Sequence, residues 1–265
     1  MGKVISVVSG KGGVGKTTIT ANLGIMLASH GKNVCLIDFD IGLNNLDVVL
    51  GVENKVVYDL SDCLSGKCRP VQAIIQDDFL STLYILPCSK TLTSDVNGDK
   101  FVSLVNSIRD MFDFVIIDAP AGIGGGFKLS VIPADEVYVV VGSHISSIRD
   151  ADKVIGIITS VFNKDAYIVV NKIRGDLVIS GEMLSIKEIE NLLSIKIIGV
   201  LPDSDELAIY NSFLTKIASF REKEVYNAFS IFTSNVINGT FHIYNIENKY
   251  RGICGLIRRL AKRRS

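Results

Sequence analysis

Short apolar runs alternate with longer segments in which apolar residues recur every three or four positions. The runs are rich in Val and Ile, which is typical of parallel strands buried on both faces. The longer segments are typical of amphipathic helices. Expected strands are residues 3–8, 33–38, 82–87, 113–118, 136–141, 166–171 and 196–201, and expected helices are 17–30, 98–111, 148–161, 185–194 and 218–237. The alternation predicts an α/β domain with a mostly parallel sheet and helices on both faces.

A glycine-rich polar segment follows the first predicted strand and leads directly into the first predicted helix. It has the sequence Gly-Lys-Gly-Gly-Val-Gly-Lys-Thr-Thr over residues 10–18. This order is typical of a phosphate-binding loop, because glycines let backbone N–H groups surround phosphate oxygens at a helix N-terminus. Lys16 is expected to reach the outer phosphates, and the Thr17 hydroxyl suits Mg²⁺. The predicted nucleotide contacts are Gly10, Lys11, Gly12, Gly13, Val14, Gly15, Lys16, Thr17 and Thr18.

Other polar residues lie where predicted strands end, which is where open α/β sheets bind ligands. Asp38 ends one apolar run and Asp40 follows it, while Asp118 ends a second run of four apolar residues. The second pattern is that of a Walker B aspartate, which holds Mg²⁺ directly or through water. One of the first two carboxylates alternatively caps the next turn. Asn171, near the end of a later strand, is a weaker candidate for hydrogen bonds to an adenine edge.

The net charge of zero conceals a strongly basic end. Seven of the 28 basic residues lie within 249–265, which holds no acidic residue. Placed on a helix, residues 250–264 separate apolar from basic side chains, as in helices that lie in a membrane interface. The predicted membrane contacts are Ile253, Leu256, Ile257, Leu260, Arg258, Arg259 and Lys262. Residues 1–238 are expected to form the domain with the phosphate-binding loop, 239–249 a linker and 250–265 the amphipathic helix. The alternatives for the last segment are a helix packed on the domain and an arm that binds nucleic acid.

Several classes of protein are disfavoured by composition. No apolar run reaches the roughly 18–20 residues of a membrane span, and Lys3 leads directly into a core strand rather than into a secretory signal. The five cysteines form no Cys-x-x-Cys pair, and the spacing of Cys63 and Cys68 differs from that of common zinc knuckles. These features favour a reducing cytosol.

The segment from Lys11 to Thr18, with its two lysines, resembles the deviant Walker A motif of the ParA/MinD superfamily of P-loop ATPases. Residues 37–47 and 118–123 are similar to switch I and switch II of its MinD branch, the septum-site-determining ATPases. The matching segments occur in the same order nearly from end to end, and the basic tail also matches. The resemblance is therefore more specific to that branch than to the superfamily as a whole.

The resemblance implies ATP and Mg²⁺ as cofactors and an ATP-dependent homodimer. Lys11 would reach the partner's phosphates, Asp40 would orient the attacking water, and Asp38 and Asp118 would support Mg²⁺ through water. Asn171, Pro202 and Asp203 would frame the adenine. The dimer would move from the cytoplasm to the anionic inner face of the cell membrane and recruit a MinC-like division inhibitor. A MinE-like or topological regulator would then stimulate hydrolysis and release, with no nucleic acid involved.

The chain departs from the resemblance at three places. Gly124 stands where Glu is usual after switch II, and Asn44 where Arg is common. A motif near the adenine is reduced to residues 210–213, in which Asn211 is kept. The alternative functions are a flagellar-number ATPase, which usually has an extra segment before the first strand, and a ParA-type DNA-segregation ATPase. The second is disfavoured because acidic residues outnumber basic ones, 28 to 21, before residue 249.

Overall fold

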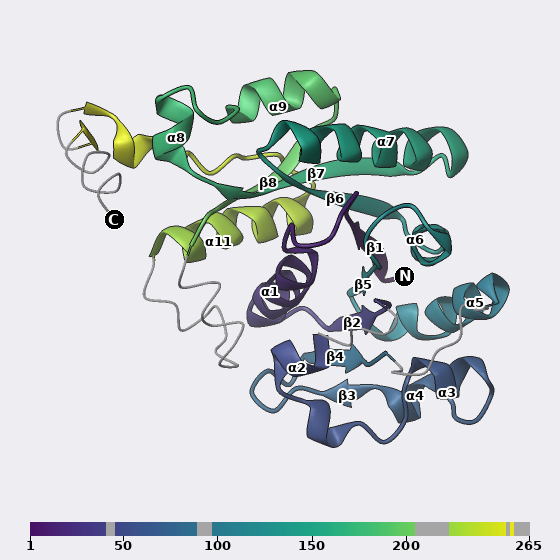
Figure 1. The fold of residues 1–265 in the computed structure, drawn as a ribbon. Helices are drawn as coiled ribbons and strands as arrows, with labels where there is room; N and C mark the ends of the chain where they lie inside the picture. The colour runs from purple at the N-terminus through teal and green to yellow at the C-terminus, as the bar shows by residue number, and fades with distance from the viewer. Residues whose placement is uncertain (41–45, 89–96, 205–222, 253–254, 257–265) are drawn as a thin grey trace.

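The computed structural model describes residues 1–40, 46–88, 97–204, 223–252 and 255–256. Their strands form one eight-stranded sheet in the order β3-β4-β2-β5-β1-β6-β7-β8 (Figure 1). Neighbouring strands are parallel except at one edge, where β3 is antiparallel to β4. The strands are β1 Lys3–Val8, β2 Val34–Asp38, β3 Ile75–Gln76, β4 Leu83–Leu86, β5 Phe114–Asp118, β6 Glu136–Gly142, β7 Asp165–Ile173 and β8 Ile197–Pro202.

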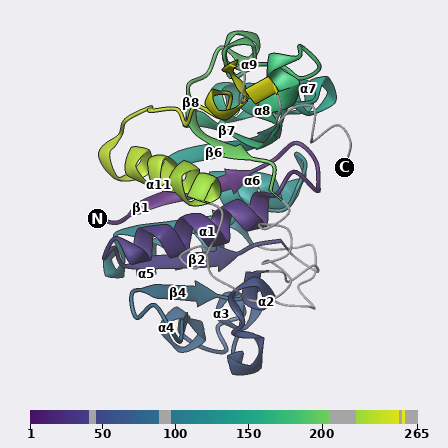
Figure 2. The same cartoon turned by 90° about the vertical axis from the view of Figure 1, so that its left-hand side faces the viewer.

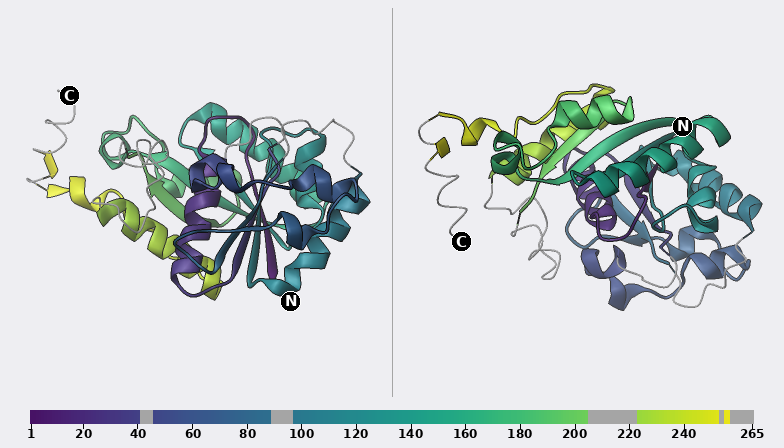
Figure 3. Two further views of the ribbon diagram at one scale, coloured as in Figure 1. Left: turned by 90° about the horizontal axis from the view of Figure 1, so that it is seen from below. Right: turned by 45° about the horizontal axis from the view of Figure 1, so that its top comes forward.

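Helices cover both faces of this sheet, as Figures 2 and 3 show from other directions. One hydrophobic cluster joins the sheet to α5, α6, α7 and α9, and the other joins it to α1, α2 and α11. The helices are α1 Lys16–Ser29, α2 Leu46–Leu50, α3 Leu60–Leu64, α4 Pro70–Ala73, α5 Gly98–Ile108, α6 Gly125–Val131, α7 Ile145–Val161, α8 Gly175–Ile179, α9 Ile186–Leu193 and α11 Lys223–Asn238, with 3-10 turns at Glu53–Lys55, Arg109–Met111 and Asn248–Tyr250. The predicted architecture is confirmed.

The seven predicted strands are present, each within two residues of its expected bounds. Four predicted helices correspond to α1, α5, α7 and α9, although α7 begins three residues earlier than expected. The fifth corresponds to α11, and residues 218–222 of that prediction lie outside the described residues. The elements missed are the edge strand β3 and five helices of four to seven residues, α2, α3, α4, α6 and α8.

Strand β1 shows why the sheet is buried on both faces. Val4 and Val8 enter one hydrophobic cluster, whereas Ile5 and Val7 enter the other. Ser6 lies between them with no exposed surface, and its hydroxyl is 3.1 Å from that of Ser130 on α6. A buried hydroxyl without a partner destabilises the fold, so this contact satisfies Ser6 and ties α6 to the central strand.

The C-terminal segment packs against the domain. Residues 239–247 contain no helix or strand, yet Ile246 and Tyr250 are only 3% and 5% exposed. A Cβ atom at Gly175, the first residue of α8, would lie 2.4 Å from the carbonyl oxygen of Ile246. Glycine is therefore needed for this close approach. Lys249 also forms an ion pair with Glu224 on α11, so the proposed linker has fixed contacts with two helices.

Most of the predicted amphipathic helix falls outside the described residues. Of the predicted membrane contacts, Ile253, Ile257, Leu260, Arg258, Arg259 and Lys262 are outside, and Leu256 is inside with half of its surface exposed. Across the described part of the chain, no helix combines the length and the apolar character needed to cross a bilayer.

Candidate nucleotide site

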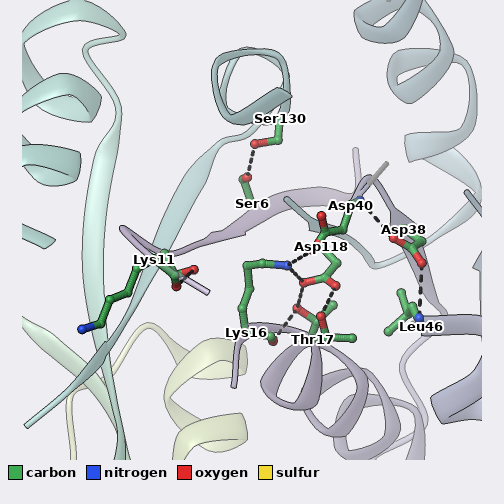
Figure 4. Close-up of polar contacts among 11 residues, drawn as sticks. Ser6, Lys11, Lys16, Thr17, Asp38, Asp40, Leu46, Asp118 and Ser130 are labelled. Carbon is green, nitrogen blue, oxygen red and sulfur yellow. Dashed lines mark hydrogen bonds and ion pairs between the residues drawn. The ribbon is translucent and has the colours of Figure 1, made fainter. Parts of the chain in front are cut away.

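The carboxyl ends of the parallel strands bring most of the predicted site together (Figure 4). The glycine-rich loop leaves β1 and ends at Lys16, the first residue of α1. Asp38 and Asp118 end the neighbouring strands β2 and β5, where they are direct register partners. Topology thus places two carboxylates beside a loop that comes from a distant part of the chain.

The glycines shape the loop in two ways. Gly13 and Gly15 have φ angles of +81° and +92°, in the left-handed region that favours glycine. A Cβ atom at Gly15 would lie 2.4 Å from Nδ2 of Asn171, whereas one at Gly12 or Gly13 would meet nothing within 4 Å. The loop is therefore tightly packed at its base and open around Gly12 and Gly13, where an anion can approach its N–H groups.

The carboxylate of Asp118 accepts most of the hydrogen bonds in the site. Its Oδ1 accepts a hydrogen bond of 2.7 Å from Lys16 Nζ, and its Oδ2 accepts one of 2.7 Å from the Thr17 hydroxyl. Lys16 is 6% exposed, and its Nζ is also 3.6 Å from Oδ2 of Asp40. Four predicted site residues thus form one cluster of charged and polar side chains, called the charge cluster below: Lys16, Thr17, Asp40 and Asp118. Thr20, which sequence reasoning missed, lies one turn after Lys16 with its hydroxyl 3.1 Å from Asp118 Oδ1.

Asp38 is buried and binds the backbone of the segment that follows. Its two oxygens accept hydrogen bonds from the backbone N–H groups of Asp40 at 3.0 Å and Leu46 at 3.2 Å. Asp38 therefore caps the backbone that follows β2, which is the alternative role that the sequence allows for it. Burial, and then the negative charge of Asp118, raise the pKa of Asp38 to about 7. Partial burial also raises the pKa of Asp40, which the positive charge of Lys16 opposes.

The raised pKa of Asp38 predicts a pH-dependent stability. Between pH 3.8, its unperturbed pKa, and about 7, the folded chain retains a proton that the unfolded chain has lost. Stability must therefore fall as pH rises through this interval. Asp38→Asn does not ionise and keeps one of the two acceptor oxygens, so it is expected to flatten this decline, which amounts to roughly 2–4 kcal/mol in the unchanged protein. Urea unfolding from pH 4.5 to 8, in EDTA without nucleotide, measures this; parallel profiles for both proteins would contradict it.

Asn171 supports the base of the loop. Its Nδ2 donates a 2.8 Å hydrogen bond to the carbonyl of Val14, and the residue is 2% exposed. Its Oδ1 is buried and has no hydrogen-bond partner within the described residues. Asp203 is exposed just beyond β8, and its N–H donates to the carbonyl of Ile173 at 3.0 Å. The structure therefore joins Pro202 and Asp203 to the end of β7, while Asn211 and Asn44 lie outside the described residues.

Lys11 lies apart from the charge cluster. Its side chain is exposed and points away from Lys16 (Figure 4), and its Nζ is 3.1 Å from the Ser146 hydroxyl on α7. Lys11 therefore does not contribute to the ion pair at Asp118 within one chain.

The donor atoms of the cluster fit magnesium and a nucleotide phosphate. A threonine hydroxyl and carboxylates are hard oxygen ligands of the kind that Mg²⁺ prefers, together with phosphate oxygens and water. Within the described ranges, no three His, Cys, Asp or Glu side chains are placed to hold a metal ion by themselves. The open loop and the buried lysine complement the negative charge of phosphates, and the Asn171 oxygen, without a partner in the part of the chain that the structure describes, can accept a hydrogen bond from a base.

Comparison with known proteins agrees with this geometry. Residues 5–214 match the family described as the CobQ/CobB/MinD/ParA nucleotide binding domain. The septum site-determining protein MinD of Bacillus subtilis (strain 168) is 39% identical over 261 residues, which are 97% of each chain. The chain belongs to the MinD family. The MinD of Thermotoga maritima is 46% identical over 212 residues, covering 79% of this chain and 78% of that protein.

Solved MinD structures share the fold. The MinC:MinD cell division protein complex of Aquifex aeolicus contains a chain with a TM-score of 0.86 and 37% identity, covering 92% of this chain and 98% of that one. MinD of Pyrococcus horikoshii OT3, solved as a complex with Mg-ADP, has a TM-score of 0.80 and 27% identity and covers 90% of this chain and 97% of that one. The predicted family and fold are thereby confirmed.

Proposed function

We propose that this chain is an ATPase that uses ATP and Mg²⁺ to select the cell-division site, as the names of its MinD relatives indicate. The observation that carries the proposal is the position of Lys16. Its buried ammonium lies at the N-terminus of α1 between the carboxylates of Asp118 and Asp40, in a loop open to an anion. A buried cation next to a helix N-terminus has the electrostatics of a phosphate site.

Each residue of the cluster would have a separate role in ATP hydrolysis. Bound ATP supplies the phosphoryl group, and Mg²⁺ neutralises its developing charge. Residues 10–18 would hold the phosphates through backbone N–H groups and Lys16. The Thr17 hydroxyl would bind Mg²⁺, and Asp38 and Asp118 would act on it through water. Asp40, which is half-buried and beside Lys16, would orient the attacking water.

The remaining contacts support roles for Asn171 at the adenine and for Lys11 at a second copy of the chain. Oδ1 of Asn171, which has no hydrogen-bond partner among the described residues, is an acceptor suited to the exocyclic amine of adenine, and Pro202 and Asp203 would frame the base. Lys11 is exposed and uninvolved in the cluster of its own chain. It would instead reach the phosphates bound by a second copy, so that ATP holds a homodimer together.

The dimer would bind the anionic inner face of the cell membrane through residues 250–265 and recruit a MinC-like inhibitor. Each of the seven basic residues contributes about 1 kcal/mol near an anionic leaflet, but folding the tail on binding costs about 2–5 kcal/mol. One tail is therefore a marginal anchor. Two joined tails gain roughly 10²–10⁴ in avidity. A MinE-like or topological regulator would end the cycle by stimulating hydrolysis.

Liposome sedimentation of the full chain tests this proposal. With Mg²⁺ and vesicles containing phosphatidylglycerol, sedimentation is expected to be at least tenfold greater with ATP than with ADP, because only ATP joins two tails. Neutral phosphatidylcholine vesicles serve as the control and should retain little protein. Equal sedimentation with both nucleotides would refute the membrane switch, and absence of Mg²⁺-dependent phosphate release would refute the ATPase.

A further inference from the structure

Lys172 has an unusual backbone conformation for its position. Three non-glycine residues in the described part of the chain have positive φ angles, Asn163, Lys172 and Ser194. Ser194 caps the end of α9, and Asn163 follows the end of α7, where left-handed residues are common. Lys172, with φ of +56°, lies inside strand β7. Such a conformation persists in a strand only where the surroundings require it.

The left-handed residue changes the direction of the side chains. In a regular strand, successive side chains point to opposite faces. Here Asn171 and Lys172 both reach the glycine-rich loop: Asn171 Nδ2 donates to the carbonyl of Val14 at 2.8 Å, and Lys172 Nζ donates to the carbonyl of Gly13 at 3.0 Å. The pairing of β7 with β8 is irregular between Val170 and Ile173, the interval that contains Lys172.

Two consecutive carbonyls of the loop are therefore held by two consecutive residues of β7. In a phosphate-binding loop the N–H groups must face the anion, so a carbonyl that rotated inward would repel it. Outward-facing carbonyls need donors of their own. Asn171 and Lys172 supply these donors for Val14 and Gly13.

We propose that Lys172 is a positioning residue for the phosphate-binding loop. Its left-handed backbone directs its ammonium to the Gly13 carbonyl and keeps that carbonyl turned away from the phosphates, without contact between Lys172 and the nucleotide. The proposal rests on the ATP site described above, and it assigns to Lys172 a role that the Walker motifs do not include.

Lys172→Met tests the proposal, because methionine keeps an unbranched side chain but has no donor. ATP affinity measured by calorimetry with Mg²⁺ is expected to fall about tenfold, which corresponds to the loss of one charge-assisted hydrogen bond. ADP affinity should fall by a similar factor. Lys172→Arg, which keeps a cationic donor, should recover most of the loss. Lys187→Met, on the exposed surface of α9, is the matched control and should bind as the unchanged protein does.

Hydrogen exchange separates positioning from direct contact. In the nucleotide-free protein, Lys172→Met should speed amide exchange at residues 12–15 severalfold, whereas a lysine that only touched the nucleotide would leave it unchanged. Lys172→Gly accommodates the left-handed backbone without strain and should lose ATP affinity as Lys172→Met does. Unchanged ATP affinity in both variants would overturn the proposal, as would lost affinity with unchanged exchange. Failure of the unchanged protein to bind ATP would instead refute the proposed function.

Discussion

Lys16→Ala is expected to abolish detectable ATP binding. Lys16 supplies the buried ammonium of the site, 2.7 Å from Asp118 and 3.6 Å from Asp40. Without it, the phosphates would approach several carboxylates with no lysine charge to offset them, and we expect affinity to fall at least 10²-fold, or about 3 kcal/mol. The free energy of unfolding should also fall by about 3 kcal/mol, because Asp118, 1% exposed, loses its ionic partner.

The two effects can be separated with a double variant. Asp118→Asn removes the unpaired charge that Lys16→Ala leaves behind, so the double variant should regain much of the lost stability but none of the ATP affinity. Calorimetry measures the affinity and urea unfolding the stability, with Lys187→Ala as the surface-lysine control. ATP affinity near that of the unchanged protein in Lys16→Ala would contradict the site proposed here.

Lys11→Ala is expected to leave ATP binding within a few-fold of normal but to abolish ATP-dependent dimerisation. The Lys11 side chain is exposed, and its Nζ contacts Ser146 rather than the cluster around Asp118. Its removal therefore leaves the phosphate-binding loop of its own chain unchanged. If Lys11 acts on the phosphates of a second copy, as arginine fingers do, turnover should fall by about 10³-fold.

Light scattering after size exclusion, with Mg²⁺ and either ATP or ADP, measures the dimer directly. Ser146→Ala is the matched control: it removes the contact within one chain but keeps the ammonium, so it should still dimerise with ATP. A Lys11→Ala protein whose mass doubles with ATP would exclude a role for this lysine across the interface.

The sheet and the phosphate-binding loop were predictable because their signals are local. Buried parallel strands such as β6 are rich in valine, and the glycines and lysines of residues 10–18 are adjacent in sequence. The positions of Asp38 and Asp118 followed from the rule that ligands bind at strand ends. Short helices such as α3 were missed, because four or five residues are too few to show a helical period.

Features that depend on contacts between distant segments were not predictable. The position of Lys172 beside Gly13 needs a left-handed residue within β7, which no residue preference indicates for lysine. The spacing of Cys63 and Cys68 did not show that their sulfur atoms lie 3.5 Å apart. Asn171 was expected at the adenine, but its closest described contact is the loop itself.

The docking of Ile246 and Tyr250 against α8 sets the length of any membrane tether. The predicted membrane contacts lie within 12 residues after Tyr250, and a chain of that length spans about 40 Å when extended and about 18 Å as a helix. Counted from Gly239 instead, the extended reach would be longer by roughly 35 Å. If the tail binds a bilayer as proposed, that bilayer would lie close to the side of the molecule formed by α8 and α11, and rotation of the ATPase domain on the membrane would be restricted.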